Sequence, residues 1–258
     1  MNYILTEINE KVCIIKLNRP DVLNSFNREM ALGLIAELQK CAIDDNIRAI
    51  LLTAEGRAFC AGQDLKEVIG ENAMPLDQVV REHYNEIIKQ LRTIEKPIVC
   101  AVNGVAAGAG ANIALACDIT FAGEKASFIQ AFSAIGLIPD SGGTFTLPKL
   151  IGMQRASALA FLGEKVSAKE AETMGMIYRC IEQESLYETA LSTAKKLSEM
   201  PTYGIGLTKR AFNASMNNDL LSQLNLEEEL QVLAGNSHDY NEGVSAFLEK
   251  RKPNFTGK

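Results

Sequence analysis

The sequence PIVCAVNGVAAGAGANIALA, residues 97–116, is the stretch that decides the fold. Its first six residues form an apolar run that begins at Pro97, which predicts a buried strand. Glycine and alanine fill the turn that follows, and the small residues of Ala109–Ala116 predict a short helix. A buried strand that leads through a tight turn into a helix is a building block of α/β proteins.

Apolar runs on either side of this stretch predict further strands of the same core, with helices between them. We expect strands at residues 12–17 (VCIIKL), 49–53 (AILLT) and 118–122. Residues 27–41 show helical periodicity and can be capped by Asn27. Residues 76–94 predict a long helix that ends before Pro97. The first half of the chain therefore predicts a mixed α/β core.

The second half of the chain has a mostly helical pattern. After about residue 139 we expect helices at 153–162, 168–174 and 182–198, and one short strand at 177–181. Pro201 marks a joint, beyond which three more helices are expected at about 202–217, 219–235 and 238–250. The sequence thus predicts two regions, a core over residues 1–198 and a helical C-terminal region over residues 199–258.

Composition and charge exclude several classes of protein. Hydrophobic residues make up 47% of the chain and charged residues 22%, as in ordinary globular proteins. The formal net charge of −6, with no sustained basic block, argues against nucleic-acid binding. No apolar run approaches the roughly 20 residues that cross a bilayer, and the first ten residues lack the pattern of a secretion signal. We therefore expect no membrane partner.

The cysteines and histidines indicate a cytoplasmic protein without a metal site. None of the six cysteines belongs to a CxxC pair and most lie in apolar runs, which favours reduced, buried thiols. His83 and His238 are the only imidazoles, too few for a histidine-based metal centre. We expect neither a metal nor a redox cofactor.

Three segments contain candidate functional residues, and the first is residues 57–65 (RAFCAGQDL). It follows the strand at 49–53, and ligand sites in α/β proteins gather at the carboxyl ends of strands. The small residues Cys60, Ala61 and Gly62 let a ligand approach the main chain, so a backbone N–H can point at a ligand oxygen. Taken alone, the segment also fits an ordinary structural turn.

The second segment, residues 103–112 (NGVAAGAGAN), follows a strand and opens a helix. The first turn of a helix has unpaired N–H groups and a partial positive charge, so an anionic oxygen is stabilised there. Its small residues keep side chains away from such an oxygen. Close packing of the helix on the sheet requires the same small residues, and this segment alone leaves both interpretations open.

The third segment is residues 136–144 (GLIPDSGGT), in which Asp140 stands between an apolar run and a glycine turn. A carboxylate beside apolar groups tends to have a raised pKa, which suits a group that shuttles protons. Taken alone, the segment favours Asp140 as the cap of the helix that follows Gly143, or as part of a turn with it.

Other motif matches fail on the residues that their chemistry needs. Residues 140–143 (DSGG) match the surroundings of a serine-protease nucleophile, but His83 lies in a helical segment without an orienting acid. Residues 108–110 resemble a dinucleotide-binding loop, but Ile113 occupies the place of its third glycine. His83 with Glu86 is half of a metal site with no second pair.

Taken together, the three segments resemble the crotonase, or enoyl-CoA hydratase/isomerase, superfamily. The resemblance runs along the whole chain in the family's order and spacing. Its segments are residues 17–20 (LNRP), 23–26 (LNSF), 58–65, 103–112, 116–119 (ACDI) and 136–144. The resemblance implies a crotonase-like α/β spiral of ββα repeats, completed by a helical C-terminal region that supports homotrimers, often paired into hexamers.

The resemblance also implies an oxyanion hole for the carbonyl oxygen of an acyl-CoA thioester. By motif position, its two backbone N–H groups belong to Gln63 and Ala109, where many members of the family have glycine instead of alanine. Hydratases of the family generally use two glutamates, and the matching positions here are Asn112 and Phe132. Neither can act as a carboxylate base, so hydration by the usual route is disfavoured. Asp140 matches the acidic position of double-bond-shifting isomerases.

Within the superfamily, several segments resemble the branch that converts ring-1,2-epoxyphenylacetyl-CoA to an oxepin in phenylacetate breakdown. They are residues 58–65 (AFCAGQDL), 100–111 (CAVNGVAAGAGA), 131–144 (AFSAIGLIPDSGGT), 242–251 (EGVSAFLEKR) and 253–258 (PNFTGK). We expect an isomerase that acts through an enolate and also shifts double bonds in enoyl-CoA. The alternatives are a Δ3,Δ2-enoyl-CoA isomerase, an atypical enoyl-CoA hydratase and a non-catalytic acyl-CoA-binding protein.

The expected substrate contacts follow from the same resemblance. Coenzyme A, as part of the substrate, would lie along the loop of Cys60, Ala61, Gly62 and Asp64, with Gly108 nearby. Phe132 and Ile138 would line the acyl pocket. The expected phosphate contacts are Lys66 and one of the C-terminal basic residues Lys250, Arg251 and Lys252.

Overall fold

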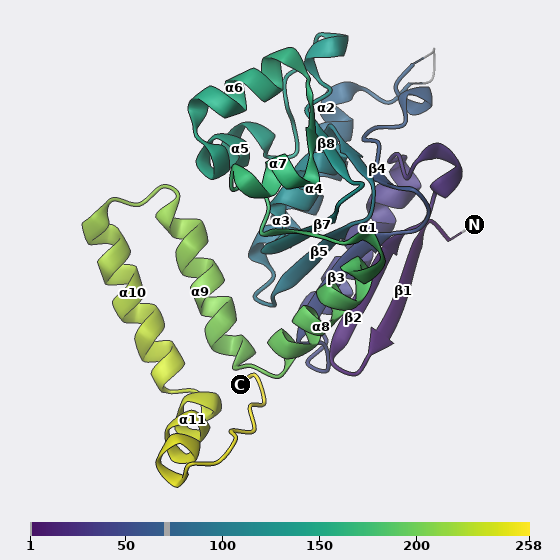
Figure 1. Ribbon diagram of the computed structural model, residues 1–258. Helices are drawn as coiled ribbons and strands as arrows, with labels where there is room; N and C mark the ends of the chain where they lie inside the picture. Colours follow the sequence, from purple (N-terminus) through teal and green to yellow (C-terminus); the bar gives the residue numbers. More distant parts are fainter. Residues whose placement is uncertain (1, 70–72) are drawn as a thin grey trace.

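The computed structural model describes residues 2–69 and 73–258, and its centre is a six-stranded sheet with the order β1-β2-β3-β5-β7-β10 (Figure 1). All neighbouring strands are parallel except β1, which is antiparallel to β2. The strands are β1 (Ile4–Asn9), β2 (Val12–Leu17), β3 (Ala49–Ala54), β5 (Ile98–Val102), β7 (Ile119–Gly123) and β10 (Arg179–Ile181). The expected strands are confirmed, whereas β1, half of whose residues are exposed, had given no clear apolar pattern.

Both faces of this sheet are buried. Alternate residues of a strand point to opposite sides, and in this sheet each side packs in its own hydrophobic cluster. Val12 and Ile14 of β2 pack in the cluster formed with helix α8 (Leu186–Ser198). Cys13 and Ile15 belong to the larger core, together with helix α1 (Arg28–Ile43). This double burial explains why the strands read as continuous apolar runs rather than as an alternating pattern.

A second, smaller sheet has the order β4-β6-β8-β9 and consists of three-residue strands. Its strands are β4 (Ala58–Cys60), β6 (Val105–Ala107), β8 (Ser127–Ile129) and β9 (Lys165–Ser167). In the chain, β4 follows β3, β6 follows β5 and β8 follows β7, and each pair leads to helical structure. This repeated succession is the expected crotonase-like spiral of ββα units. The sequence had not indicated these short strands, because three residues are too few for a period.

The helices of the core follow the three strand pairs. The expected helix at 76–94 is one helical stretch, in which α2 (Leu76–Val79) passes through a π-helical segment (Val80–Tyr84) into α3 (Asn85–Thr93). The remaining core helices are α4 (Ala109–Ala116), α5 (Gly143–Ile151), α6 (Met153–Leu162) and α7 (Ala168–Thr173). Short 3-10 turns lie at Pro20–Val22, Leu65–Glu67, Ser133–Ile135 and Gln183–Ser185.

Three C-terminal helices, α9 (Thr202–Ser215), α10 (Leu220–Gly235) and α11 (His238–Glu249), extend from one side of the core (Figure 1). The tail behind them returns to the core, where the Arg48 guanidinium donates to the carbonyl oxygen of Phe255 at 2.7 Å. Within the described ranges, no helix has the length and apolar character that crossing a membrane requires.

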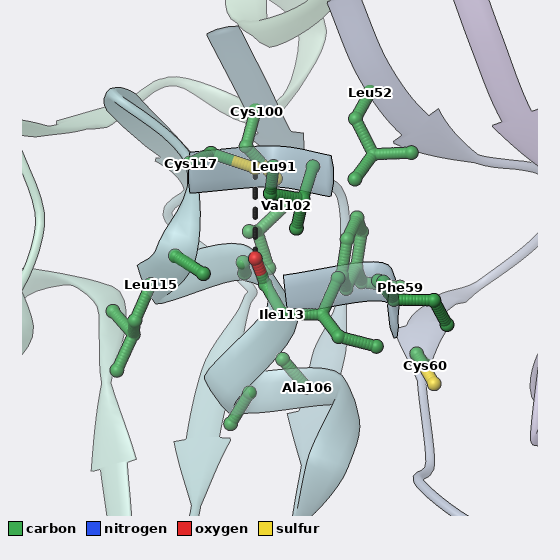
Figure 2. Close-up of a cluster of buried hydrophobic side chains, with 14 of the residues drawn as sticks. Leu52, Phe59, Cys60, Leu91, Cys100, Val102, Ala106, Ile113, Leu115 and Cys117 are labelled. Atoms are coloured by element: carbon green, nitrogen blue, oxygen red, sulfur yellow. Dashed lines mark hydrogen bonds between the residues drawn. The ribbon is translucent and has the colours of Figure 1, made fainter. Parts of the chain in front are cut away.

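Helix α4 lies at the centre of the larger core, and all eight of its residues are buried. Figure 2 shows Ile113 of this helix among Phe59, Leu91 and Val102, which come from three other elements. The Cys117 thiol at its end donates to the carbonyl oxygen of Ile113. Because α4 is enclosed on every side, its first turn and the groups bonded to it are held rigidly.

Candidate active site

A cavity of about 210 Å³ lies where the chain leaves the small parallel strands β4, β6 and β8. Its walls combine the turn after β4, the first turn of α4 and the segment after β8, as expected at the carboxyl ends of parallel strands. The described residues that line it are Ala61, Gly62, Gln63, Leu65, Val68, Leu76, Val79, Tyr84, Gly108, Ala109, Ala131, Phe132, Ile135, Leu137 and Asp140.

The turn after β4 is fixed by an adjoining loop in a way that directs the Gln63 amide. Phe26 donates its N–H to the Gly62 carbonyl at 2.7 Å and accepts the N–H of Asp64 at 2.8 Å. In such a parallel bridge Gln63, which lies between Gly62 and Asp64, directs its own N–H away from Phe26. The N–H of Gln63 has no acceptor among the described residues, and Gln63 lines the cavity.

The turn between β6 and α4 brings a second amide to the same place. Gly108 has a φ of +53°, a conformation that glycine adopts without strain, and Ala109 begins the helix. The Ala109 N–H belongs to the first helical turn, where the helix itself supplies no acceptor. A Cβ atom on Gly62 would lie 3.8 Å from the Ala109 nitrogen, so the two turns are in direct contact.

Gly110 makes this contact between the turns possible. A Cβ atom at residue 110 would lie 2.5 Å from the carbonyl oxygen of Cys60, which is too close for a side chain of any kind. The small residues of this segment therefore serve close packing and an accessible main chain at once. The two interpretations of the segment that the sequence left open are compatible in the structure.

Asp140 lines the cavity with a carboxyl group that does not cap a helix. Helix α5 begins after Gly142 without a side-chain cap, and the Asp140 carboxylate instead accepts a hydrogen bond from Ser141 Oγ at 2.8 Å. Burial raises the pKa of Asp140 above its ordinary value, although the Ser141 hydroxyl opposes this shift. A carboxyl group with a raised pKa beside an apolar wall is suited to accept and return a proton.

Tyr84 is a cavity residue that the sequence interpretation missed. Its hydroxyl group donates to Oε1 of Gln63 at 2.6 Å, and Gln63 Nε2 donates to the Asp64 carbonyl at 3.2 Å. Burial raises the pKa of the Tyr84 phenol, as does the nearby Asp140 charge. Tyr84 ends the π-helical segment, and such segments often occur at functional sites. No property of the sequence indicated this change of helical pitch.

Residues 7–258 match the enoyl-CoA hydratase/isomerase family. The chain belongs to this family. It is 49% identical over 261 residues to the 1,2-epoxyphenylacetyl-CoA isomerase of Escherichia coli (strain K12), covering all of both chains. It is 32% identical over 258 residues to the 2,3-dehydroadipyl-CoA hydratase of the same organism, again covering all of both chains.

The structural comparison agrees with this membership. The crystal structure of an enoyl-CoA hydratase from Bacillus anthracis has a TM-score of 0.92 to this chain and is 33% identical in sequence. The match covers 99% of this chain and all of the other. The resemblance seen in the sequence is thus confirmed, and the chain is an enzyme with acyl-CoA isomerase/hydratase activity of this family.

Several residues expected in the family site line the cavity, and several do not. Ala61, Gly62, Gln63, Gly108, Ala109, Phe132 and Asp140 line it, whereas Cys60, Asp64, Lys66 and Ile138 are outside its lining. Ile138 is 77% exposed, and its place in the acyl pocket stays a prediction. Its neighbour Leu137, whose N–H donates to the Phe132 carbonyl, does line the cavity.

Cys60 and Asp64 stabilise the turn after β4 from outside the cavity lining. Cys60 is fully buried, and its burial raises the pKa of its thiol to about 12. Asp64 Oδ2 lies 3.0 Å from Arg19 Nη2, which ties the turn to the loop of residues 19–26. In this chain both side chains hold the main chain in place rather than reach the cavity.

The basic residues expected near the phosphates lie at the surface. Lys66 is exposed, and a phosphate contact there stays a prediction. Arg251 Nη1 lies 2.6 Å from Glu242 Oε1, so its charge already has a partner within the chain.

Across residues 2–69 and 73–258, no cluster of three or more His, Cys, Asp or Glu side chains could hold a metal ion. That the reaction needs no cofactor stays a prediction.

Proposed function

We propose that this enzyme isomerises acyl-CoA thioesters through an enolate, with Asp140 as the residue that moves the proton. The observation that carries the proposal is that Asp140 is the one carboxyl group among the described residues that line the cavity. Its pKa is raised by burial, which brings it closer to the operating pH of a general base.

In the proposed reaction, the thioester carbonyl oxygen accepts hydrogen bonds from the N–H groups of Gln63 and Ala109. Asp140 takes a proton from a carbon near the carbonyl, the electron pair of the broken C–H bond passes toward the thioester, and negative charge gathers on its oxygen. The protonated Asp140 then returns the proton to another carbon. Removing one donor of such an oxyanion site typically costs about 10²–10³ in rate.

The substrate that we propose is ring-1,2-epoxyphenylacetyl-CoA, converted to its oxepin in phenylacetate degradation, with double-bond shifting in enoyl-CoA as a second activity. The proposal is supported by 49% identity to a 1,2-epoxyphenylacetyl-CoA isomerase along the whole chain. In addition, Phe132 and Leu137 give the cavity an apolar wall that suits an aromatic ring.

An assay of the purified enzyme with epoxyphenylacetyl-CoA and with cis-3-enoyl-CoA tests this proposal, with liquid chromatography to separate the isomers, which have equal mass, before mass-spectrometric detection. We expect the epoxide to be converted with the higher kcat/KM. Turnover of the enoyl substrate alone would favour a Δ3,Δ2-enoyl-CoA isomerase, and brisk hydration of crotonyl-CoA would favour an atypical hydratase. Binding of acyl-CoA without any turnover would leave only a binding protein.

Asp140→Asn tests the role of the carboxyl group directly. Asparagine keeps an acceptor for Ser141 Oγ but cannot take a proton at neutral pH, so we expect a loss of kcat of at least about 10²-fold with acyl-CoA binding retained. Asp21→Asn, at an exposed position, is the matched control and should keep wild-type turnover. Near-normal turnover by a folded Asp140→Asn protein would remove Asp140 from the chemistry.

We also propose that the enzyme works in the cytoplasm as a homotrimer or hexamer assembled through its C-terminal helices. Large apolar side chains on these helices are exposed in the single chain, and exposed apolar patches of this kind mark interaction surfaces. They include Phe212, Leu220, Leu221, Phe247 and Leu248, each at least 63% exposed. Light scattering with the purified protein measures the number of subunits.

A further inference from the structure

The cavity wall that carries Asp140 is hydrogen-bonded to the buried core through the side chain of Asn112. Residues 133–138, which precede Asp140, are exposed and form little more than a single 3-10 turn. Asn112 lies on the buried helix α4 and donates from Nδ2 to the main-chain carbonyl oxygen of Asp140 at 2.9 Å. This bond connects the Asp140 loop, whose preceding residues are exposed, to a helix whose residues are all buried.

The orientation of the Asn112 amide is fixed from its other end. Gln130, which follows β8 and is only 3% exposed, donates from Nε2 to Asn112 Oδ1 at 2.9 Å. With its oxygen occupied in this way, the amide can present only its NH₂ group to Asp140. The two bonds connect α4, the end of β8 and the Asp140 loop.

The backbone around Asp140 is shaped to fit this amide. A Cβ atom on Gly143 would overlap Asn112 Nδ2, so glycine leaves the room that the amide occupies. Ser141 has a φ of +51°, a strained conformation for a residue other than glycine, and it is almost fully buried. A strained turn persists only when its surroundings hold it, and the Asn112 bond is one of the contacts that do so.

We propose that Asn112 is a positioning residue for Asp140, and that it holds the carboxyl group at the cavity through its bonds to the Asp140 carbonyl and to Gln130. The inference rests on the proposed function, in which Asp140 moves the proton. Asn112 itself is not among the residues that line the cavity.

Asn112→Ala tests the proposal by removing the donor to the Asp140 carbonyl. A displacement of about 1 Å can cost about 10²-fold in rate, so we expect kcat to fall by about 10²-fold while KM changes little. The acid limb of the pH–rate profile should also move toward the ordinary pKa of an aspartate, because a loosened loop returns the carboxyl group to water. The other polar groups that act on this carboxyl are its own backbone and Ser141, and Tyr84 is the titratable side chain that feels its charge.

Asn112→Asp keeps the size and shape of the side chain but replaces the NH₂ donor, so it tests the hydrogen bond to the Asp140 carbonyl apart from the packing. Burial raises the pKa of the introduced carboxyl group. Above that pKa the carboxylate turns an acceptor toward the Asp140 carbonyl oxygen, so the contact becomes repulsive and turnover should fall at least as far as in Asn112→Ala. The matched control is Asn213→Ala, which loses hydrogen bonds to Arg92, a residue outside the cavity lining, and should keep wild-type kcat. A decrease that merely followed loss of stability would appear in this control too.

Gln130→Met keeps the test decisive if the Asn112 variants do not fold. It leaves Asn112 in place but removes the hydrogen bond that fixes the orientation of its amide. The loss of one such bond can cost roughly 1.4 kcal/mol, which corresponds to a decrease of about tenfold in kcat. Unchanged kcat in either a folded Asn112→Ala protein or in Gln130→Met would overturn the proposal.

Hydrogen exchange separates a failure of this inference from a failure of the proposed function. In Asn112→Ala, the amides of residues 141–143 should exchange faster, whatever substrate the enzyme uses. If the wild type converts none of the acyl-CoA substrates, the proposed function fails while faster exchange still shows that Asn112 holds the loop. If the wild type is active and exchange is unchanged in the variant, the positioning role is wrong.

Discussion

The hydroxyl oxygen of Tyr84 lies 2.6 Å from Oε1 of Gln63, at the edge of the cavity that Asp140 also lines. The second group of the Gln63 amide, Nε2, donates to the Asp64 carbonyl at 3.2 Å. Both ends of this side chain are therefore bonded, which fixes the residue whose main-chain N–H we assign to the oxyanion site. We therefore expect Tyr84 to act on the proposed chemistry through Gln63.

Tyr84→Phe removes this bond and leaves the aromatic ring in place. Because a hydrogen bond of this kind contributes about 0.5–1.5 kcal/mol, we expect kcat to fall by about three- to tenfold with KM nearly unchanged. Steady-state kinetics measures both. Tyr178→Phe, which alters an exposed tyrosine whose side chain is outside the cavity, should match the wild type. A Tyr84→Phe enzyme with wild-type kcat would contradict the role of the bond.

The pH dependence of turnover should reflect the buried carboxyl group. Asp140 must be ionised to accept a proton, and burial raises its pKa above the ordinary value for aspartate, about 3.9. We therefore expect kcat/KM to fall toward acid pH with a midpoint clearly above that value. The measurement is a pH–rate profile of kcat/KM at constant ionic strength. A midpoint at or below about 4 would mean that a different group carries the acid limb.

The same shift predicts how Asp140→Asn changes stability. With a folded-state pKa above the unfolded value, the native state binds more protons than the unfolded state between the two values, so this group makes stability fall as pH rises. Removing the charge should raise Tm at pH 7, and the gain should vanish below the unfolded pKa of about 3.9, where both states are protonated. Calorimetry at several pH values tests this, and a gain independent of pH would argue against a buried carboxylate.

Gly110→Ala should separate the two turns that form the oxyanion site. The added Cβ atom would meet the Cys60 carbonyl oxygen at 2.5 Å, and a backbone atom cannot move aside as a side chain can. We expect a loss of stability of about 1–3 kcal/mol. Because displaced donors no longer match the carbonyl oxygen, turnover should also fall by about 10²-fold.

Gly235→Ala is the matched control for this variant. Gly235 lies in α10, and an added Cβ atom there meets nothing within 4 Å. The higher helix propensity of alanine should leave the protein equally stable or more stable by up to about 1 kcal/mol. If urea unfolding and turnover showed the same effect in both variants, the contact between Gly110 and Cys60 would not be the cause.

Much of the fold could be predicted from the sequence, because strands buried on both faces leave continuous apolar runs. Residues 12–17, 49–53 and 97–102 were predicted as strands for this reason and are β2, β3 and β5. The strands of the small sheet could not be predicted, because three residues carry no periodicity. Strand β1 was not predicted, because it lies at the edge of the sheet and only Ile4 of its six residues is buried.

The candidate site divides in the same way. By itself, the sequence determined that small residues surround the amides of Gln63 and Ala109 and that Asp140 follows an apolar run, since these properties depend on neighbours in the chain. Only the tertiary structure decided that Tyr84 reaches Gln63, that Asn112 donates to the Asp140 carbonyl and that Leu137 lines the cavity. Hydrogen bonds between residues 21 or 28 positions apart depend on how strands and helices pack, and no local pattern encodes that distance.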